Sequence, residues 1–203
     1  MAYSGMCEDN LIHELFGKQP KRFLDIGAGG AEVLSNTRFL LEQGWSGVWV
    51  DASYRSVPDL LARQKLFKSG QVEVIHAAIS AKNELRRIYN PSDYLITTMS
   101  QPLQDRGHER TNAESFWMGT STVNDILAVL PGPYHFITID IEGLSLEVMR
   151  TIDYRSLECT AVCVEYLKAE HLGVDEAPII VEYMKQHDFR HYVTTQENVI
   201  CIR

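Results

Sequence analysis

The sequence lacks the features that mark membrane, secreted and nucleic-acid-binding proteins. No run approaches the ~18 uncharged apolar residues that a membrane-spanning helix needs, and the first residues do not follow the basic-then-apolar order of a secretory signal. Basic residues are few, because 19 lysines and arginines stand against 27 aspartates and glutamates. A phosphate backbone binds a basic surface, so this balance argues against a nucleic-acid partner. We therefore expect a cytoplasmic protein without a membrane partner.

Cysteine is scarce as well, and its spacing excludes two kinds of site. The four cysteines form neither a CxxC pair nor a disulfide-dense framework: Cys7, Cys159, Cys163 and Cys201. We interpret them as buried thiols in a reducing compartment. The chain does have 45% hydrophobic residues among 203, enough for the core of one α/β domain. No repeat or linker divides it, so residues 1–203 are predicted to form a single domain.

Short apolar runs alternate with helix-like segments along most of the chain. Strands are predicted at residues 22–27, 46–51, 71–79, 134–142, 160–166, 189–194 and 199–202. Helices are predicted at residues 8–17, 34–43, 57–68, 122–130, 146–152 and 177–187. This alternation predicts a doubly wound α/β fold with a mostly parallel, seven-stranded sheet that helices cover on both faces.

Two segments depart from that alternation. Only Thr195–Asn198 separates the last two strands, which is too short for a crossover, so these strands should form an antiparallel C-terminal hairpin. Residues 90–120 are polar and interrupted by proline and glycine. Because long loops in compact domains are usually functional, this segment is predicted to be a substrate lid or a small β insertion.

A glycine turn at the first strand–helix junction is the strongest candidate for a ligand site. The run Phe23–Gly30 reads Phe-Leu-Asp-Ile-Gly-Ala-Gly-Gly, and Asp51 ends the second strand. In a doubly wound sheet, such a turn lets the backbone approach a nucleotide-type ligand, and an acidic residue in the position of Asp51 accepts hydrogen bonds from ribose hydroxyls. The alternative is a glycine turn that serves only tight packing.

The charges around this turn distinguish between cofactors. A dinucleotide-binding turn continues as G-x-G-x-x-G, but here the third glycine position is Glu32, and Asp25 directly precedes the turn. Carboxylates repel a pyrophosphate and attract the sulfonium and ammonium groups of S-adenosylmethionine. The residues therefore favour S-adenosylmethionine over NAD, and the lack of a Gly-Lys-Ser/Thr sequence excludes a Walker-type phosphate loop.

Several blocks along the chain, taken together, resemble one family. They are, in order, Asp25–Ala28, Ser35–Thr37, Gly44–Gly47, Asp51, Ile139–Gly143, Glu147–Met149, Asp153, Val164–Glu165 and Asn198–Ile200. This series resembles the FkbM-like family of S-adenosylmethionine-dependent class I methyltransferases, from about residue 22 to 203 except for 80–118. The chain departs from the family pattern at Gly29, Ala31 and Asp51–Ala52, where the family usually has Asn, Gly and Glu-Pro.

The resemblance implies a Rossmann-like methyltransferase fold and O-methylation of a hydroxyl on a small molecule or glycan. From the glycine turn, the strand ends and the resemblance together, the predicted cofactor-binding residues are Asp25, Gly27, Ala28, Gly29, Asn36, Thr37, Asp51, Ala52, Ala78 and Asp140. Two other readings remain open: a non-catalytic module that binds S-adenosylmethionine without turnover, and an NAD-binding Rossmann enzyme.

Three carboxylates near the ends of the fourth and fifth strands are the predicted catalytic residues. Asp140 and Glu142 are two positions apart, so on a strand they share one face, and Glu165 ends the neighbouring strand. An alcohol must lose a proton before it attacks, so we expect Asp140 near the methyl group or the acceptor hydroxyl, with Glu142 and Glu165 on the acceptor side. Three carboxylates can also hold Mg²⁺, an alternative that we do not favour.

Overall fold

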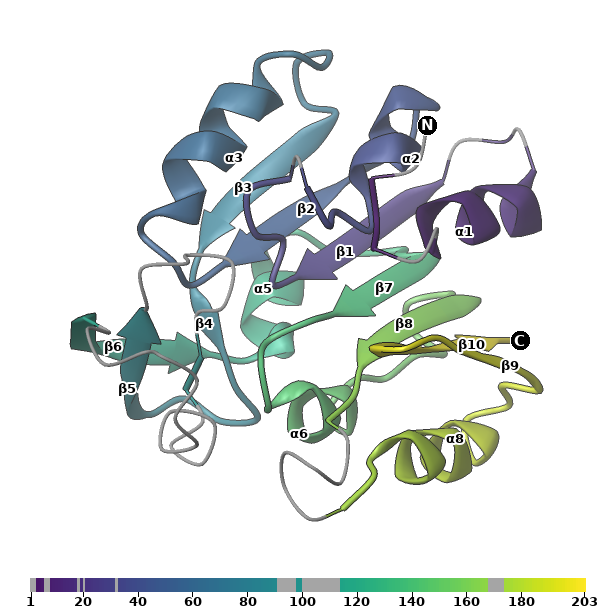
Figure 1. The fold of residues 1–203 in the computed structure, drawn as a ribbon. Coiled ribbons are helices and arrows are strands. Elements are labelled where there is room, and N and C mark those ends of the chain that lie inside the picture. Colours follow the sequence, from purple (N-terminus) through teal and green to yellow (C-terminus); the bar gives the residue numbers. More distant parts are fainter. Residues whose placement is uncertain are drawn as a thin grey trace.

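A seven-stranded sheet forms the centre of the molecule (Figure 1). The computed structural model describes residues 3–5, 8–17, 19, 21–31, 33–90, 98–99, 114–167 and 174–203. The strands are, in sheet order, β3 (Val72–His76), β2 (Ser46–Asp51), β1 (Arg22–Ile26), β7 (Phe136–Ile139), β8 (Ala161–Glu165), β10 (Asn198–Ile202) and β9 (His191–Thr194). The five strands from β3 to β8 are parallel, and β10 pairs antiparallel with both β8 and β9. The predicted fold class and its C-terminal hairpin are thus confirmed.

The order of the strands places a topological switch point at β1. From β1 the chain moves outward through β2 and β3 on one side, and then returns to β7 and β8 on the other side. Ligands of doubly wound sheets bind at the carboxyl ends of the strands that flank such a point. The glycine turn after β1 lies at this position.

Helices cover both faces of the sheet, and strand alternation divides the apolar residues between two cores. One face carries α1 (Glu8–Phe16), α2 (Arg38–Glu42) and α3 (Ser56–Gln64), and the other carries α5 (Val123–Val129), α6 (Ser145–Met149) and α8 (Ala177–Lys185). On β1, for example, Phe23 packs into the core under α1–α3, whereas Leu24 packs into the opposite core. None of the described helices is long and apolar enough to cross a membrane.

The helix predicted at 34–43 is shorter in the structure, and side-chain bonds to the sheet explain why. Residues 33–37 are irregular, and Leu34 has a φ of +61°, so the helix α2 begins only at Arg38. The Thr37 hydroxyl donates to Asp25 on β1 instead of capping the helix, and the Asn36 amide donates to Thr138 on β7. These bonds hold residues 36 and 37 against the strand ends.

The strand predicted at 71–79 divides between two sheets. Residues 72–76 form β3, whereas β4 (Ala78–Ile79) pairs with β6 (Glu114–Ser121), which is antiparallel to β5 (Leu85–Asn90). The break falls at Ala77, whose backbone N–H donates to the carbonyl of Asp51. For the predicted lid or insertion at 90–120, residues 91–97, 100 and 101–113 lie outside the described residues. The described part is β6, which pairs with β5, and the residue pair Thr98–Met99.

The contact between Gly47 and Phe23 gives a test of packing between β1 and β2. A Cβ added to Gly47 would lie 2.4 Å from the Phe23 ring, and that ring is fully buried. We expect Gly47→Ala to lower the free energy of unfolding by about 1–3 kcal/mol, because the core must shift to admit the methyl group. Gly119→Ala on β6 is a matched control, because nothing lies within 4 Å of its new Cβ. Its free energy of unfolding should change by no more than about 0.5 kcal/mol. Urea denaturation of both variants checks this, and equal effects would contradict it.

Candidate functional site

A cavity of about 420 Å³ lies at the carboxyl ends of β1, β2, β7 and β8. Its volume falls within the range of ~300–1,000 Å³ that is usual for small-molecule and cofactor sites. Nine of the twelve predicted site residues line it: Gly27, Ala28, Gly29, Asn36, Asp51, Ala52, Asp140, Glu142 and Glu165. The tertiary structure therefore brings together residues that are as many as 138 positions apart in the sequence, from 27 to 165.

The glycine turn is held by backbone bonds and by a close approach to β7. The amides of Gly27 and Ala28 donate to the Val50 carbonyl at 2.8 and 3.1 Å. Gly27 has a φ of +91°, and a Cβ at this position would lie 1.7 Å from the Asp140 carbonyl oxygen. Only glycine fits both the left-handed backbone and this contact. The missing side chain therefore lets the glycine turn pack against the backbone at the end of β7.

Asp51 connects the turn to the end of β2. Its two oxygens accept hydrogen bonds from the backbone amides of Gly29 at 2.8 Å and Ser53 at 2.7 Å. Burial raises the pKa of Asp51 to about 6, and the bonds from Ser53 and Gly29 oppose that rise. Each carboxylate oxygen accepts more than one hydrogen bond, so Asp51 can hold the turn and also accept from a ligand hydroxyl.

Three predicted cofactor-binding residues lie behind the cavity wall, and their contact with a cofactor stays a prediction. Asp25, Thr37 and Ala78 are buried and do not line the cavity. The Thr37 hydroxyl donates to Asp25 at 2.6 Å and accepts from the Trp49 indole at 2.9 Å. Asp25 and Thr37 thus fasten the segment before α2 to the sheet, and Ala77, not Ala78, faces the cavity.

The three predicted catalytic carboxylates meet, although not on a common strand. The strand β7 ends at Ile139, so Asp140 and Glu142 lie in a turn, where Glu142 has a φ of +51°. The expectation that they share a strand face is therefore wrong. Instead, Glu165 at the end of β8 accepts from the Glu142 amide at 3.1 Å and from the Ser145 hydroxyl at 3.4 Å. One oxygen from each carboxylate lies within 4.8 Å of the others.

Crowding of these carboxylates changes their proton affinities. Burial raises the pKa of Asp140 to about 6, and a hydrogen bond with Glu165 opposes that rise. Burial and the charges of Asp140 and Glu142 raise the pKa of Glu165 well above its ordinary value. The Asp140–Glu165 pair therefore binds a proton more readily than two separate carboxyl groups would.

The cavity also has lining residues that are not among the predicted site residues. Tyr166 and Leu167 follow Glu165, and Gln196, Glu197 and Asn198 form and follow the turn between β9 and β10. Asn198 pairs with Glu165 in the β8–β10 register. The predicted hairpin indicated these residues. The turn that precedes β10 must lie at the carboxyl end of β8, because β10 pairs antiparallel with β8.

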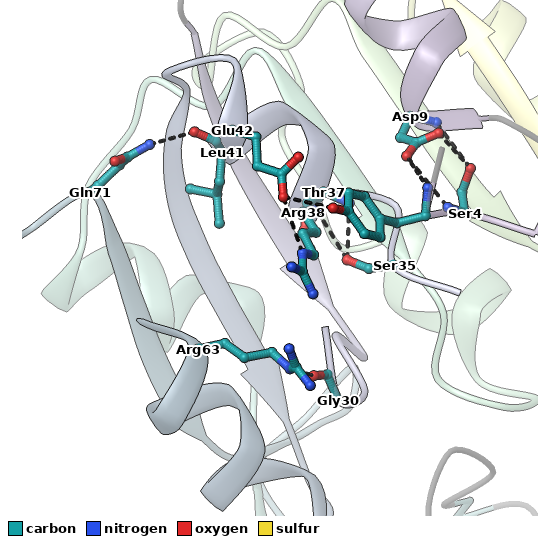
Figure 2. Close-up of polar contacts among 11 residues, drawn as sticks. Ser4, Asp9, Gly30, Ser35, Thr37, Arg38, Leu41, Glu42, Arg63 and Gln71 are labelled. Atoms are coloured by element: carbon teal, nitrogen blue, oxygen red, sulfur yellow. Dashed lines mark hydrogen bonds and ion pairs between the residues drawn. The ribbon is translucent and has the colours of Figure 1, made fainter. Parts of the chain in front are cut away.

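Figure 2 shows a contact between α3 and the end of the glycine turn, and a separate contact within the N-terminal segment. The Arg63 guanidinium on α3 donates to the Gly30 carbonyl at 3.0 Å. In the N-terminal segment, the Ser4 hydroxyl donates to Asp9 at 2.8 Å, and the next residue, Gly5, lines the cavity. From the described part of the insertion, the Thr98 hydroxyl donates to the Glu142 carbonyl at 2.6 Å. The cavity thus draws on both ends of the chain and on the insertion.

Comparisons with known proteins show the fold but no family. No family model and no curated protein matches the chain. Among solved structures, methyltransferase FkbM from Methylobacillus flagellatus aligns with a TM-score of 0.58 and 12% identity, over 91% of this chain and 44% of that one. The ribosomal protein L11 methylase of Lactobacillus delbrueckii subsp. bulgaricus aligns with a TM-score of 0.53 and 13% identity, over 97% and 76%. The chain has the Rossmann-like fold of methyltransferases.

A third solved structure covers nearly the whole of both chains. The precorrin-6y C5,15-methyltransferase of Geobacter metallireducens aligns with a TM-score of 0.52 and 12% identity, over 98% of this chain and 88% of that one. Two of the three names state what is methylated, a precorrin in one and ribosomal protein L11 in the other. The common feature is therefore the fold, and the acceptor has to be argued from this chain's own residues.

Asp25 gives a test of the buried charges behind the site. Burial raises its pKa from 3.8 to about 7, so the folded protein binds this proton more tightly than the unfolded chain. The proton on Asp25 therefore stabilises the folded state, and this stabilisation is complete below pH 3.8 and is lost as the pH rises through 7. We expect Asp25→Asn to gain stability relative to the wild type between about pH 5 and about pH 8, by an amount on the order of a few kcal/mol.

Urea denaturation at several pH values measures this difference. Asp59→Asn, which changes an exposed carboxyl group on α3, should follow the wild type across the range. Parallel curves for the wild type and Asp25→Asn would show that Asp25 is not the titrating group.

Proposed function

We propose that this protein is an S-adenosylmethionine-dependent methyltransferase of the FkbM-like type. The observation that carries the proposal is the charge of the cavity at the switch point. Five carboxyl groups line it, and no lysine, arginine or histidine does among the residues that the structure describes: Asp51, Asp140, Glu142, Glu165 and Glu197. A lining of this kind suits a cation and repels a pyrophosphate.

The residues present fit S-adenosylmethionine in three ways. Gly27, Ala28 and Gly29 line the cavity, so the backbone of the turn can approach a ligand. Asp51, at the end of β2, has the position that holds ribose hydroxyls in this class of fold. Asp140, at the end of β7, offers an anionic group to the cationic part of the same molecule. The alternative, NAD, would place its pyrophosphate among these carboxylates.

The carboxylate cluster supports transfer to a hydroxyl on a small molecule or glycan. When bound, S-adenosylmethionine supplies a methyl group on a positively charged sulfur. An acceptor hydroxyl becomes a good nucleophile only as its proton leaves. In the proposed reaction an oxygen of Asp140 accepts that proton, while Glu165, bonded to Asp140, keeps the carboxylate in place. Glu142 then binds the acceptor from the turn after β7.

Binding of the reaction product tests the cofactor. We expect S-adenosylhomocysteine to bind with a dissociation constant on the order of 1–100 μM, and NADH not to bind at the same concentrations. Asp51→Asn should weaken S-adenosylhomocysteine binding by about tenfold or more, because a hydrogen bond to a charged group is lost. Isothermal titration calorimetry measures all three, with Asp59→Asn as a nearby exposed control. Binding of NADH alone would overturn the proposal.

Catalysis by Asp140 is tested separately from binding. We expect Asp140→Ala to keep its fold, because its backbone contact with Gly27 remains, and to keep most of its affinity for S-adenosylhomocysteine, whose sulfur carries no charge. Its rate should fall by roughly 10²–10⁴-fold. The assay measures S-adenosylhomocysteine released from S-adenosylmethionine with a panel of hydroxyl compounds, and Asp59→Ala is the control. Unchanged turnover would remove Asp140 from the mechanism.

The same assay distinguishes turnover from binding alone and tests the magnesium alternative. If the cofactor binds tightly but no acceptor of the panel leads to release of S-adenosylhomocysteine, the result would favour a non-catalytic module. We expect activity to survive EDTA, because burial raises the pKa of both Asp140 and Glu165, and a proton held by this pair lowers the repulsion that a metal would otherwise relieve. Loss of activity in EDTA and its return with Mg²⁺ would assign a metal to the cluster instead.

A further inference from the structure

A strained leucine lies beside the cavity. Leu34, in the segment between the glycine turn and α2, has a φ of +61°. The left-handed region brings the Cβ of a bulky residue close to the following carbonyl oxygen, so this conformation costs free energy that glycine or asparagine would largely avoid. Strain of this kind persists where the surrounding structure imposes it, and it is concentrated at functional sites. Some gain must therefore offset the strain at Leu34.

Packing inside the protein does not supply that gain. Ala31 also has a positive φ, but it is fully buried in the core under α1–α3, so its burial offsets the strain. In contrast, Leu34 is 55% exposed and Val33 is 62% exposed, and neither belongs to the two apolar cores of the described residues. Both side chains line the cavity instead. Large apolar side chains exposed beside a cavity are typical of a surface that a ligand covers.

The residues that follow hold Leu34 in this position. The Ser35 hydroxyl accepts from the Arg38 amide at 3.1 Å (Figure 2), and the Asn36 amide donates to Thr138 on β7 at 3.2 Å. Ser35 is 2% exposed and Asn36 is 7% exposed. Because these two side chains are bound inside the protein, they fix the path of the chain directly after Leu34. The structure thus imposes the strained backbone and keeps the leucine side chain at the cavity.

The contacts of this segment place Leu34 on the side of the cavity away from Asp51. Besides the bond to β7, Leu34 has a neighbour in the N-terminal segment, because a Cβ added to Gly5 would lie 3.5 Å from Leu34 Cδ2. Three residues after Gly5, Glu8 accepts from the Asn198 side chain on β10 at 3.1 Å. In the sheet, β7 and β10 lie on the opposite side of β1 from β2, which Asp51 ends. Leu34 therefore borders the space left for the methyl acceptor.

The strand end on the same side adds further apolar lining. Tyr166 and Leu167 follow β8 and line the cavity. The Tyr166 hydroxyl donates to the Thr195 carbonyl at 3.1 Å, so its hydrogen is already used within the protein and the ring is what this side chain offers to a ligand. Together with Val33 and Leu34, these residues give this end of the cavity aliphatic and aromatic walls.

We propose that the methyl acceptor carries its hydroxyl on an apolar skeleton, which Val33 and Leu34 cover at this end of the cavity. The inference rests on the proposed function and adds the chemical class of the substrate: an alcohol or phenol with a hydrocarbon ring or chain, in place of an unsubstituted sugar. Contact with such a skeleton removes apolar surface of both partners from water. An unsubstituted sugar would lose hydration of its hydroxyls against aliphatic side chains and is selected against.

Two probes with the same six-carbon ring test the inference on the full chain saturated with S-adenosylhomocysteine. Cyclohexanol has one hydroxyl on an apolar ring, whereas myo-inositol has a hydroxyl on every ring carbon. Amide chemical shifts of Val33, Asn36 and Tyr166, followed by NMR during titration, report binding at this end of the cavity. We expect cyclohexanol to bind with a dissociation constant on the order of 10 mM, and myo-inositol to bind at least about tenfold more weakly.

Variants of Leu34 separate contact with a ligand from a structural role. Leu34→Asn keeps a similar size, tolerates the left-handed backbone and removes the apolar surface. It should weaken cyclohexanol binding about fivefold, while its urea midpoint equals or exceeds that of the wild type. Leu34→Met keeps an apolar side chain and should retain the affinity within about twofold. The control, Leu66→Asn, changes a leucine that is 69% exposed, has no positive φ and does not line the cavity, and should leave cyclohexanol binding unchanged.

The outcomes separate this inference from the proposed function. A lower urea midpoint in Leu34→Asn would show that the protein itself covers the leucine, and a loss of S-adenosylhomocysteine affinity in this variant would assign Leu34 to the cofactor. Either result would overturn the inference, as would equal binding of the two probes or no shift with cyclohexanol up to about 100 mM. The methyltransferase proposal stands in all of these cases as long as S-adenosylhomocysteine binds to the wild type. Failure of that binding would overturn the proposed function.

Discussion

The contact between Gly27 and the Asp140 carbonyl is the constraint on which the site depends. It occurs where β1 and β7, neighbours in the sheet, reach their carboxyl ends, and the Asp140 amide bonds to Ile26 at 2.8 Å. With no side chain on Gly27, the two backbones approach so closely that any Cβ would overlap the carbonyl. This approach brings the glycine turn and the Asp140–Glu142 turn to one cavity. A ligand bound there contacts both the turn that positions it and the carboxylates that act on it.

Strand alternation gathers the polar groups of the site on one face of the sheet. Asp25 lies two residues after Phe23, and Asp51 lies two residues after Trp49. Both acidic side chains are therefore on the face of the sheet where Phe23 and Trp49 pack in the core under α1–α3. Glu165 and Asn198, paired in register, follow the same rule on β8 and β10. Because the side-chain period of a strand is two, the pattern that fills the core with aromatic and aliphatic groups also places carboxyl groups at the strand ends. The negative charge of the cavity is thus tied to the packing of the sheet.

The sequence predicted the fold well because its signals are local. Short apolar runs separated by glycine and helix-like segments give strand–helix alternation, and a four-residue gap permits only a hairpin. Failures occurred where a distant partner decides the local structure. The helix expected from residue 34 begins at Arg38 because Thr37 bonds to Asp25. The third strand divides at Ala77, where the chain leaves one sheet to pair with β6, a segment some forty residues later.

The same division applies to the site. The sequence by itself determined the glycine turn, the acidic residues at the strand ends and the C-terminal hairpin, because each follows from residue type and spacing along one short stretch. Only the tertiary structure decided that Asp25 and Thr37 support the wall while Asp51 lines it, and that Glu197 and Asn198 belong to the cavity. The physical reason is that hydrogen bonds between strands and the close approach of backbones act between residues far apart in the chain, and no local pattern records which of them will meet.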